Sequence, residues 1–317
     1  MTDPRTSLLL ERTGPAASPV LNDGCAYRER LGPDAEGRTA TAYLAQRYAH
    51  STQQEWRERI AAGQVLIDGR QANADEVLKR GCVLIWQRPP WIEPDALRSF
   101  LVLYEDDDLL AVAKPAGLPT LPGANFLQNT LLSLVSAYAP NAAPLHRLGR
   151  WTSGIVLFSR NRDTRRELIH QWSGSGMVKR YRALASGSPK KDVMTIDVPI
   201  GPVPHELLGT VHAASPSGKR ARSRVTMLER REGSFLCDVV IETGRPHQIR
   251  IHLASIGHPL VGDPLYGPGG VPVIGTRALP GDPGYHLHAL ELRFRHPADG
   301  RKMTISCEPP AILRKEA

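Results

Sequence analysis

The chain has 317 residues, of which 41% are hydrophobic and 23% are charged, and its formal net charge is +8. These values are ordinary for a globular protein, and the length suffices for two packed domains. Four scattered cysteines without a Cys-x-x-Cys pair argue against a zinc ribbon or a disulfide framework. No apolar run approaches the ~18 residues of a membrane span, and the N-terminus lacks a signal-peptide pattern. We therefore expect a cytoplasmic protein whose basic excess favours RNA or DNA as its partner.

The first part of the chain predicts a flexible segment followed by a small domain. Residues 1–38 mix proline, glycine and charge without a sustained period, which is typical of a flexible N-terminal segment. Residues 39–90 contain two groups of apolar residues at helical spacing, followed by short apolar runs at residues 65–67 and 83–86 that predict strands. A proline-rich linker is expected at residues 87–94.

The rest of the chain, residues 97–310, predicts a β-rich α+β domain. Residues 100–104 and 109–113 are apolar runs separated by an acidic turn, which is the pattern of a β-hairpin. Residues 130–138 and 164–172 have helical spacing, and a proline follows the first of them.

One stretch of this domain carries the strongest functional signal. Residues 145–154 read Leu-His-Arg-Leu-Gly-Arg-Trp-Thr-Ser-Gly and run directly into the apolar residues 155–159. A polar, glycine-containing turn that leads into a strand is a rigid support for reactive side chains. The stretch resembles the central motif of the RluA-type family of RNA pseudouridine synthases, which reads His-Arg-Leu-Asp, two variable residues, then Thr-Ser-Gly. Gly149 stands where that family has its catalytic Asp, and the variant form resembles a subgroup of the family with this glycine.

Three further stretches are similar to the same family, in the same order. Residues 105–117 are similar to its acidic turn, strand and Lys-Pro-x-Gly turn, residues 179–184 to its Lys-x-Tyr-x-Ala segment, and residues 242–267 to its C-terminal signature. The resemblance implies a pseudouridine-synthase-type catalytic domain over residues 97–310, built on a mainly antiparallel sheet.

Residues 39–90 are similar to the small αL-type RNA-binding module that accompanies many pseudouridine synthases. The resemblance implies phosphate contacts from Arg47, Arg57, Arg59 and Arg70. The alternative is a packing domain whose arginines are only solvated.

The reaction implied by the resemblance is the isomerisation of a uridine in structured RNA, either rRNA or tRNA. The bond from uracil N1 to ribose breaks, the base rotates, and C5 takes its place. The reaction needs no metal and no organic cofactor, because the departing and returning group is the same base. It does need a carboxylate at the reacting centre and a target nucleotide that has left its stack, at a cost of about a few kcal/mol.

The same resemblance assigns roles to individual residues. Arg245 would orient the catalytic carboxylate, and Tyr181 would stack on the uracil and assist removal of the C5 proton. Arg147 would fill the space left by the flipped nucleotide, and Ile249 would wall the uracil pocket. The remaining predicted substrate contacts are Arg250, Lys219, Arg220 and Arg222.

The residues themselves leave alternatives open. A helix that begins at Pro246 and ends before Gly257 would present anion-binding amides beside Arg245. Arg245 alternatively bonds carbonyls of its own domain, Tyr181 and Ile249 alternatively belong to the core, and the basic run is alternatively a solvated face. The helical spacing places His247 and His252 on different faces, so no metal site is expected.

Gly149 removes the chemical group on which the family's reaction depends. A working synthase would need another acid, such as Asp263 or one residue of the acidic run 106–108. The alternatives are a catalytically silent relative that only binds RNA, or an unrelated substrate. We predict an active, monomeric RNA pseudouridine synthase, and the silent RNA-binding protein is the alternative.

Overall fold

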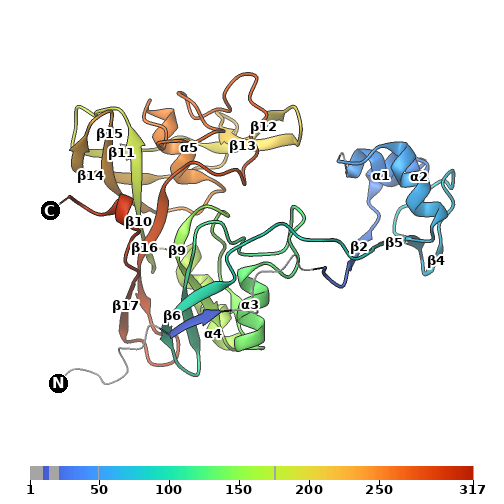
Figure 1. The fold of residues 1–317 in the computed structure, drawn as a ribbon, viewed down its shortest axis with the longest axis horizontal. Helices are drawn as coiled ribbons and strands as arrows, with labels where there is room; N and C mark the ends of the chain where they lie inside the picture. The colour runs from blue at the N-terminus through green and yellow to red at the C-terminus, as the bar shows by residue number, and fades with distance from the viewer. Residues whose placement is uncertain (1–9, 14–20, 49, 175, 317) are drawn as a thin grey trace. The chain divides into compact units, whose positions relative to one another are not determined.

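The structure is a computed structural model, and it describes residues 10–13, 21–48, 50–174 and 176–316. The chain forms two compact units (Figure 1). One consists of Pro19–Glu93, and the other combines Met1–Ser18 with Pro94–Ala317.

The smaller unit packs two helices on a short antiparallel sheet. Its elements are β2 (Cys25–Arg30), η1 (Pro33–Ala35), α1 (Ala40–Arg47), α2 (Gln53–Ala61), β3 (Val65–Ile67), β4 (Arg70–Gln71) and β5 (Val83–Arg88), with strand order β2-β5-β3-β4. Helix α2 begins with a capping box, in which Thr52 accepts from the Glu55 amide and Glu55 accepts from the Thr52 amide. The fully buried Leu44, Trp56 and Leu84 lie in a core of the unit's own residues.

The boundaries of this unit differ from the predicted ones. The expected flexible segment 1–38 contains strand β2, which pairs with β5 from Cys25↔Arg88 to Arg30↔Val83. Most side chains of β2 are exposed, so the strand lacks the alternation by which a half-buried strand is predicted. The expected linker also belongs to the unit, because Asn22 Nδ2 donates to Glu93 Oε1 at 3.0 Å. Residues 1–9 and 14–20 lie outside the described residues.

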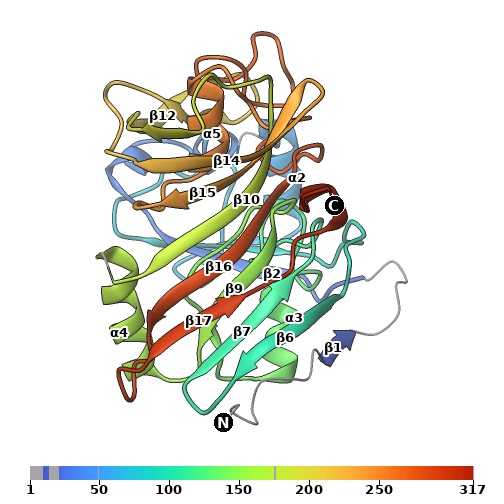
Figure 2. The ribbon, with the colours of Figure 1, turned by 90° about the vertical axis from the view of Figure 1, so that its left-hand side faces the viewer.

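The larger unit is built on a mainly antiparallel sheet, as predicted (Figure 2). Its main path runs β1-β6-β7-β9-β16-β10-β15-β14-β11, β17 pairs with β16, and β8 pairs with β9. The strands are β1 (Leu10–Thr13), β6 (Ser99–Glu105), β7 (Leu109–Lys114), β8 (Ala143–Pro144), β9 (Ser153–Ser159), β10 (Val178–Ser186), β11 (Val193–Ile196), β14 (Ser223–Arg231), β15 (Ser234–Ile241), β16 (Leu287–Arg295) and β17 (Lys302–Ser306).

The other elements of this unit are α3 (Leu131–Tyr138), α4 (Arg162–Ser173), α5 (Gln248–Ser255), η2 (Ala311–Leu313) and the hairpin of β12 (Ile200–His205) with β13 (Gly209–Ala214). The predicted hairpin of β6 and β7 and the predicted helices α3 and α4 are confirmed. Helix α3 packs against the face of β7 and β9 that carries Val112 and Phe158, whereas Leu168 of α4 packs against the opposite face. Because both faces are covered, β7 is buried along its whole length. Among the described residues, no helix is long and apolar enough to cross a membrane.

Among the strands that the structure describes, one pairing in this sheet is parallel, between β9 and β16, where His288 lies opposite Ser153 and Ala289 opposite Gly154. Gly154 has φ +105°, and a Cβ on it would lie 2.3 Å from the carbonyl oxygen of Ala289. Only glycine allows the two backbones to approach this closely. The contact places the start of β9 beside the start of β16, and both lead into the candidate active site.

Candidate active site

A pocket of about 110 Å³ lies where four segments of the larger unit meet. These segments are the motif loop before β9, strand β10 with the end of β15, the start of α5, and the residues that lead into β16. The lining residues are Arg147, Leu148, Gly149, Thr152, Tyr181, Ile241, Arg245, His247, Gln248, Ile249, Arg250, Tyr285 and Leu287.

The pocket brings together residues predicted from distant parts of the sequence. Arg147, Tyr181, Arg245, Ile249 and Arg250 all line it, as does Gly149. Sequence reasoning missed Thr152, His247, Gln248 and Tyr285 as pocket residues. His247 and Gln248 stand inside the recognised C-terminal signature, which is the signal that could have found them. No spacing or motif in the sequence indicates Tyr285.

The motif loop is held by buried polar contacts. Lys114 Nζ donates to the carbonyl oxygens of Pro115, Leu118 and Arg150 at 2.7–3.0 Å. His146 has a structural role, because its Nε2 accepts from the Leu157 amide at 3.1 Å. Burial lowers the pKa of His146 to about 3, so the ring is neutral and free to accept this bond. The loop is therefore a rigid support for Arg147 and Gly149.

Helix α5 begins two residues later than predicted. Its N-cap is His247, which has a left-handed backbone with φ 54°, so Pro246 lies before the helix. The side chain of Gln248 fixes this turn, because its Oε1 accepts from the Arg245 amide and its Nε2 donates to the Arg222 carbonyl and to Ser223. The turn and strand β14 are thus locked together at the pocket.

His247 is oriented by a tyrosine behind the pocket. Tyr266 donates its hydroxyl proton to the His212 carbonyl at 2.7 Å, so His247 Nδ1 must donate to Tyr266 Oη. Burial and the nearby Arg250 lower the pKa of His247 to about 3. The ring is therefore neutral, and its bond to Tyr266 fixes its orientation.

Tyr181 presents its ring to the pocket from the centre of the sheet. It lies opposite Val239 and Ala289, at an irregularity between Arg180 and Tyr181 in the pairing with β16. Among the described residues its hydroxyl has no hydrogen-bond partner, and burial raises its pKa to about 12. The phenol is protonated at neutral pH and is available to a ligand in the pocket.

Arg250, and not Arg245, is the deeply buried cation of the site. Its guanidinium binds Asp263 through two hydrogen bonds of 2.7 and 2.8 Å, and the two side chains are 2% and 1% exposed. It lies 4.2 Å from the ring centroid of Tyr285 and 5.0 Å from that of Tyr266. Arg250 was predicted only as an RNA contact; the structure also makes it a fixed guanidinium of the pocket, whose charge Asp263 balances.

Arg245 has a different environment from the one expected for an orienting cation. Its Nε donates to the Arg220 carbonyl at 3.0 Å, as in the alternative interpretation, while its side chain still lines the pocket. The same bond, with the Gln248 bond to Arg222, anchors the basic loop that contains Lys219 and Arg220 against the pocket wall. Lys219 and Arg220 are exposed there, whereas Arg222 is half-buried and lies 3.6 Å from Glu242.

No carboxylate lines the described pocket. Asp263 is a predicted substitute for the missing acid, but it lies behind Arg250, where it also accepts from the Leu265 and Tyr266 amides. A Cβ on Gly149 would lie 3.0 Å from the hydroxyl of Tyr285 and 3.4 Å from Thr152 Oγ1. A tyrosine hydroxyl therefore lies next to the position where the family carries its carboxylate.

The acidic run 106–108 is also removed from the pocket. It forms the turn between β6 and β7, at the end where Leu109 pairs with Ser159, whereas the pocket lies beyond Gly154 at the other end of β9. Five residues of strand separate the two ends, which is about 17 Å. Asp106 and Asp108 are therefore excluded as direct replacements for the carboxylate.

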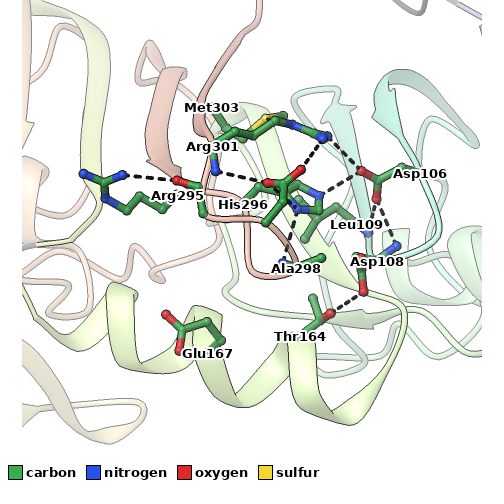
Figure 3. Close-up of polar contacts among 12 residues, drawn as sticks. Asp106, Asp108, Leu109, Thr164, Glu167, Arg295, His296, Ala298, Arg301 and Met303 are labelled. Atoms are coloured by element: carbon green, nitrogen blue, oxygen red, sulfur yellow. Dashed lines mark hydrogen bonds and ion pairs between the residues drawn. The ribbon is translucent and has the colours of Figure 1, made fainter.

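Asp106, Asp108 and His296 are close enough to hold a metal ion, but their ligand atoms are occupied (Figure 3). Asp106 accepts from the Asp108 and Leu109 amides and, at 2.9 Å, from His296 Nε2. Asp108 accepts from Thr164 and Asn161. These bonds make the cluster a structural tie between the β6–β7 turn, α4 and the end of β16.

Three of the four arginines predicted to contact phosphates in the smaller unit are ion-paired. Arg47 pairs with Glu29, Arg57 with Asp75, and Arg70 with Glu76. Arg59 lies 4.6 Å above the ring of Trp56 and donates to Ser51.

Comparison with known proteins identifies the family. A model of the RNA pseudouridylate synthase family matches residues 108–255. The chain is 41% identical to an uncharacterized RNA pseudouridine synthase of Synechocystis sp., over 86% of this chain and 95% of that protein. It is 38% identical to RNA pseudouridine synthase 5 of Arabidopsis thaliana, over 93% and 95% of the two chains. It is 32% identical to ribosomal large subunit pseudouridine synthase D of Xanthomonas campestris, over 92% and 91%.

A solved structure shows the same fold. Human RNA pseudouridylate synthase domain containing 1 superposes with a TM-score of 0.55 at 24% identity, over 69% of this chain and 87% of that chain. The extent and identity of the sequence matches, joined with this fold and pocket, lead to one conclusion. The chain belongs to the RNA pseudouridine synthase family, whose members are isomerases acting on RNA.

Proposed function

We propose that this enzyme converts a uridine of ribosomal RNA to pseudouridine in the pocket between Tyr181 and Arg250. The observation that carries the proposal is the convergence of four separate sequence segments on one pocket with three arginines and no carboxylate. Such a pocket fits a polyanionic RNA, and about 110 Å³ fits a single flipped base rather than a duplex. Ribosomal RNA is preferred to tRNA because of the large-subunit name of one relative.

Different lining residues contact different parts of the target nucleotide and its neighbours. Tyr181 stacks on the uracil, and Ile249 closes the pocket from the side of α5. Arg147 is exposed on the rigid motif loop, where its planar guanidinium stacks against neighbouring bases of the opened RNA. Arg245 contacts the backbone of the target nucleotide at the pocket wall. No cofactor is required, because substrate and product are isomers.

The test is pseudouridine formation by the pure protein. Ribosomal RNA and tRNA from cells that lack the gene are incubated separately with the protein, and pseudouridine is mapped by mass spectrometry. We expect one or a few new sites in ribosomal RNA. New sites in tRNA alone would replace the proposed substrate, and an absence of product with both RNAs would refute the activity.

The basic loop gives a second test, through RNA affinity. The loop is anchored by the main-chain oxygens of Arg220 and Arg222, so side-chain changes leave it in place. We expect Lys219→Gln with Arg220→Gln to weaken binding to ribosomal RNA and to reduce the slope of log K against log salt by about 1 to 2. The matched control, Arg162→Gln with Lys302→Gln, removes two exposed charges away from the pocket and is expected to leave the slope unchanged. Equal slopes for both double variants would contradict the role of the loop.

Cytoplasmic location and a monomeric state complete the proposal. A cytoplasmic location follows from a ribosomal substrate, and the monomeric state is the simplest assembly for this proposal. Sedimentation of the pure protein tests the second point.

A further inference from the structure

We propose that the phenolic oxygen of Tyr285 replaces the missing carboxylate of this enzyme and attacks C1′ of the target uridine. The inference rests on the proposed pseudouridine synthase activity and concerns the chemistry of the same pocket. It starts from Gly149, the residue that makes the family's usual chemistry impossible here.

The backbone does not require glycine at position 149. Gly149 lies outside the left-handed region, so a side chain causes no backbone strain there. The first atom that a Cβ would meet is the Tyr285 hydroxyl at 3.0 Å, which is tighter than an ordinary van der Waals contact. A side chain on residue 149 would thus start beside the hydroxyl of Tyr285 and would require it to give way by a few tenths of an ångström.

Tyr285 is the lining hydroxyl best placed to carry negative charge. The guanidinium carbon of Arg250 lies 4.2 Å from its ring centroid, and Asp263 holds that guanidinium through two hydrogen bonds. A fixed cation over the ring favours charge that develops on the phenolic oxygen. Tyr181, in contrast, lies between Val239 and Ala289 in the sheet and has no cation over its ring among the described residues.

The other polar groups of the pocket are less suited to this task. His247 is fixed by its bond to Tyr266, and Gln248 uses its side-chain amide to hold the turn before α5. Thr152 Oγ1 lies 3.4 Å from Tyr285 Oη, where it fits a partner that orients the phenol. Tyrosine is an established nucleophile toward an anomeric carbon in other enzymes, so its use at C1′ of ribose is chemically sound.

The proposed step balances without an added reagent. Tyr285 Oη forms a bond to C1′ while the C1′–N1 bond breaks and its electron pair moves to the uracil. The phenolic proton passes to the departing uracil, which leaves as a neutral base and rotates against Tyr181. C5 then attacks C1′, the electron pair of the C1′–O bond returns to Tyr285 Oη, and the phenolate takes the proton from C5, directly or through water. The product is an isomer of the substrate and the phenol is restored.

Three variants test the proposal, after the wild-type protein has been shown to form pseudouridine. We expect Tyr285→Phe to lower kcat by more than about 10³-fold with RNA affinity retained. Tyr138→Phe removes a tyrosine hydroxyl on α3, away from the pocket, and is expected to keep wild-type activity. Gly149→Asp in the Tyr285→Phe background is expected to recover activity, because it restores a carboxylate at the position from which the hydroxyl has gone.

A further measurement separates a chemical role from a structural one. Replacing Tyr285 by fluorotyrosine keeps the hydroxyl and the shape but makes the phenol more acidic. If the phenol reacts, the pH profile of kcat moves toward lower pH; if it only fills space, the profile stays where it is. This variant also keeps the test valid if Tyr285→Phe fails to fold.

The outcomes decide the matter. Loss of activity in Tyr285→Phe, together with a shifted profile or a rescue by Gly149→Asp, supports the proposal. More than about a tenth of wild-type activity in Tyr285→Phe, or loss with neither shift nor rescue, overturns it. Absence of pseudouridine with the wild-type protein refutes the proposed activity instead, so the two failures are distinguishable.

Discussion

At the scale of single residues, the buried charged and polar side chains around the pocket already have ion-pair or hydrogen-bond partners within the protein. Arg250 and Asp263 form a two-bond ion pair with almost no solvent exposure, and Gln248 and Lys114 use their polar atoms to fix neighbouring turns. Removing the partner of such a group lowers the free energy of unfolding strongly, because the protein interior has a low dielectric constant. Single substitutions there therefore have large and specific effects.

Asp263→Asn is expected to lower the free energy of unfolding by about 3–5 kcal/mol, because it leaves the charge of Arg250 buried without its counter-charge. Urea denaturation measures the loss. Asp192→Asn is the control, since Asp192 pairs with Arg230 at the surface, where side-chain exposure is 70% and 47%. A pair of that kind contributes less than about 1 kcal/mol. Equal effects of the two changes would contradict the role given to the buried pair.

The lowered pKa of His146 predicts that the folded protein loses stability in acid. Its folded-state pKa of about 3 lies below its ordinary value of 6.5, so below pH 6.5 the unfolded chain binds a proton that the folded chain does not. The contribution of the neutral His146 imidazole to the free energy of unfolding is complete above pH 6.5. It decreases as the pH falls and is smaller by about 2 kcal/mol at pH 5. His146→Gln keeps an acceptor for the Leu157 amide and is expected to remove this part of the loss between pH 7 and pH 5.

The control for His146 is His170→Gln, because His170 is exposed on α4. Unfolding free energies of both variants are compared at the two pH values. An unchanged pH dependence in His146→Gln would show that the imidazole does not carry the effect.

At the scale of elements, the site depends on how β9 and β16 meet. Their short parallel pairing brings the motif loop next to Tyr285. From Glu291 onward, β16 pairs with β17 instead of β9. The sequence pattern predicts β9 as an apolar run, but nothing local predicts that a strand from the C-terminal part of the chain joins it. Long-range pairing of this kind is decided by the packing of the whole unit.

Gly154→Ala tests this junction. A methyl group there would lie 2.3 Å from the Ala289 carbonyl, on a backbone with φ +105°, so we expect a loss of at least about 3 kcal/mol in unfolding free energy. Gly281→Ala is the control, because a Cβ at Gly281 meets no atom within 4 Å. A loss of less than about 1 kcal/mol in Gly154→Ala, by thermal or urea denaturation, would refute the close contact.

At the scale of the whole molecule, the fold class and several of the residues that line the pocket are predictable from the sequence, whereas the domain boundaries and the chemistry of the pocket are not. The family resemblance of the ordered motifs implies the antiparallel domain and names Tyr181 and Arg250, which both line the pocket. The start of the smaller unit was missed because β2 exposes most of its side chains. The pairing of Arg250 with Asp263 and the approach of Tyr285 to Gly149 were missed because they depend on side-chain geometry across 13 and 136 residues of sequence.

The smaller unit is expected to fold as an independent fragment of residues 19–93. Its core is formed by its own residues, among them Leu44, Trp56 and Leu84, which are fully buried. We expect a cooperative thermal transition for the fragment, and its loss in Trp56→Ala, which removes about 3–5 kcal/mol of core packing. An unfolded wild-type fragment would show that this core depends on the larger unit.

Strand β1 precedes the smaller unit in the chain, yet it pairs with β6, which follows that unit. In the chain, the smaller unit is therefore inserted between two strands that pair with each other in the sheet of the larger unit. A single proteolytic cut on either side of the smaller unit leaves it joined to the larger unit for as long as β1 stays paired. A truncated protein that begins at Pro94 lacks β1 as well as the smaller unit. Its strand β6 then has unpaired backbone donors and acceptors at the edge of the sheet, which promote aggregation.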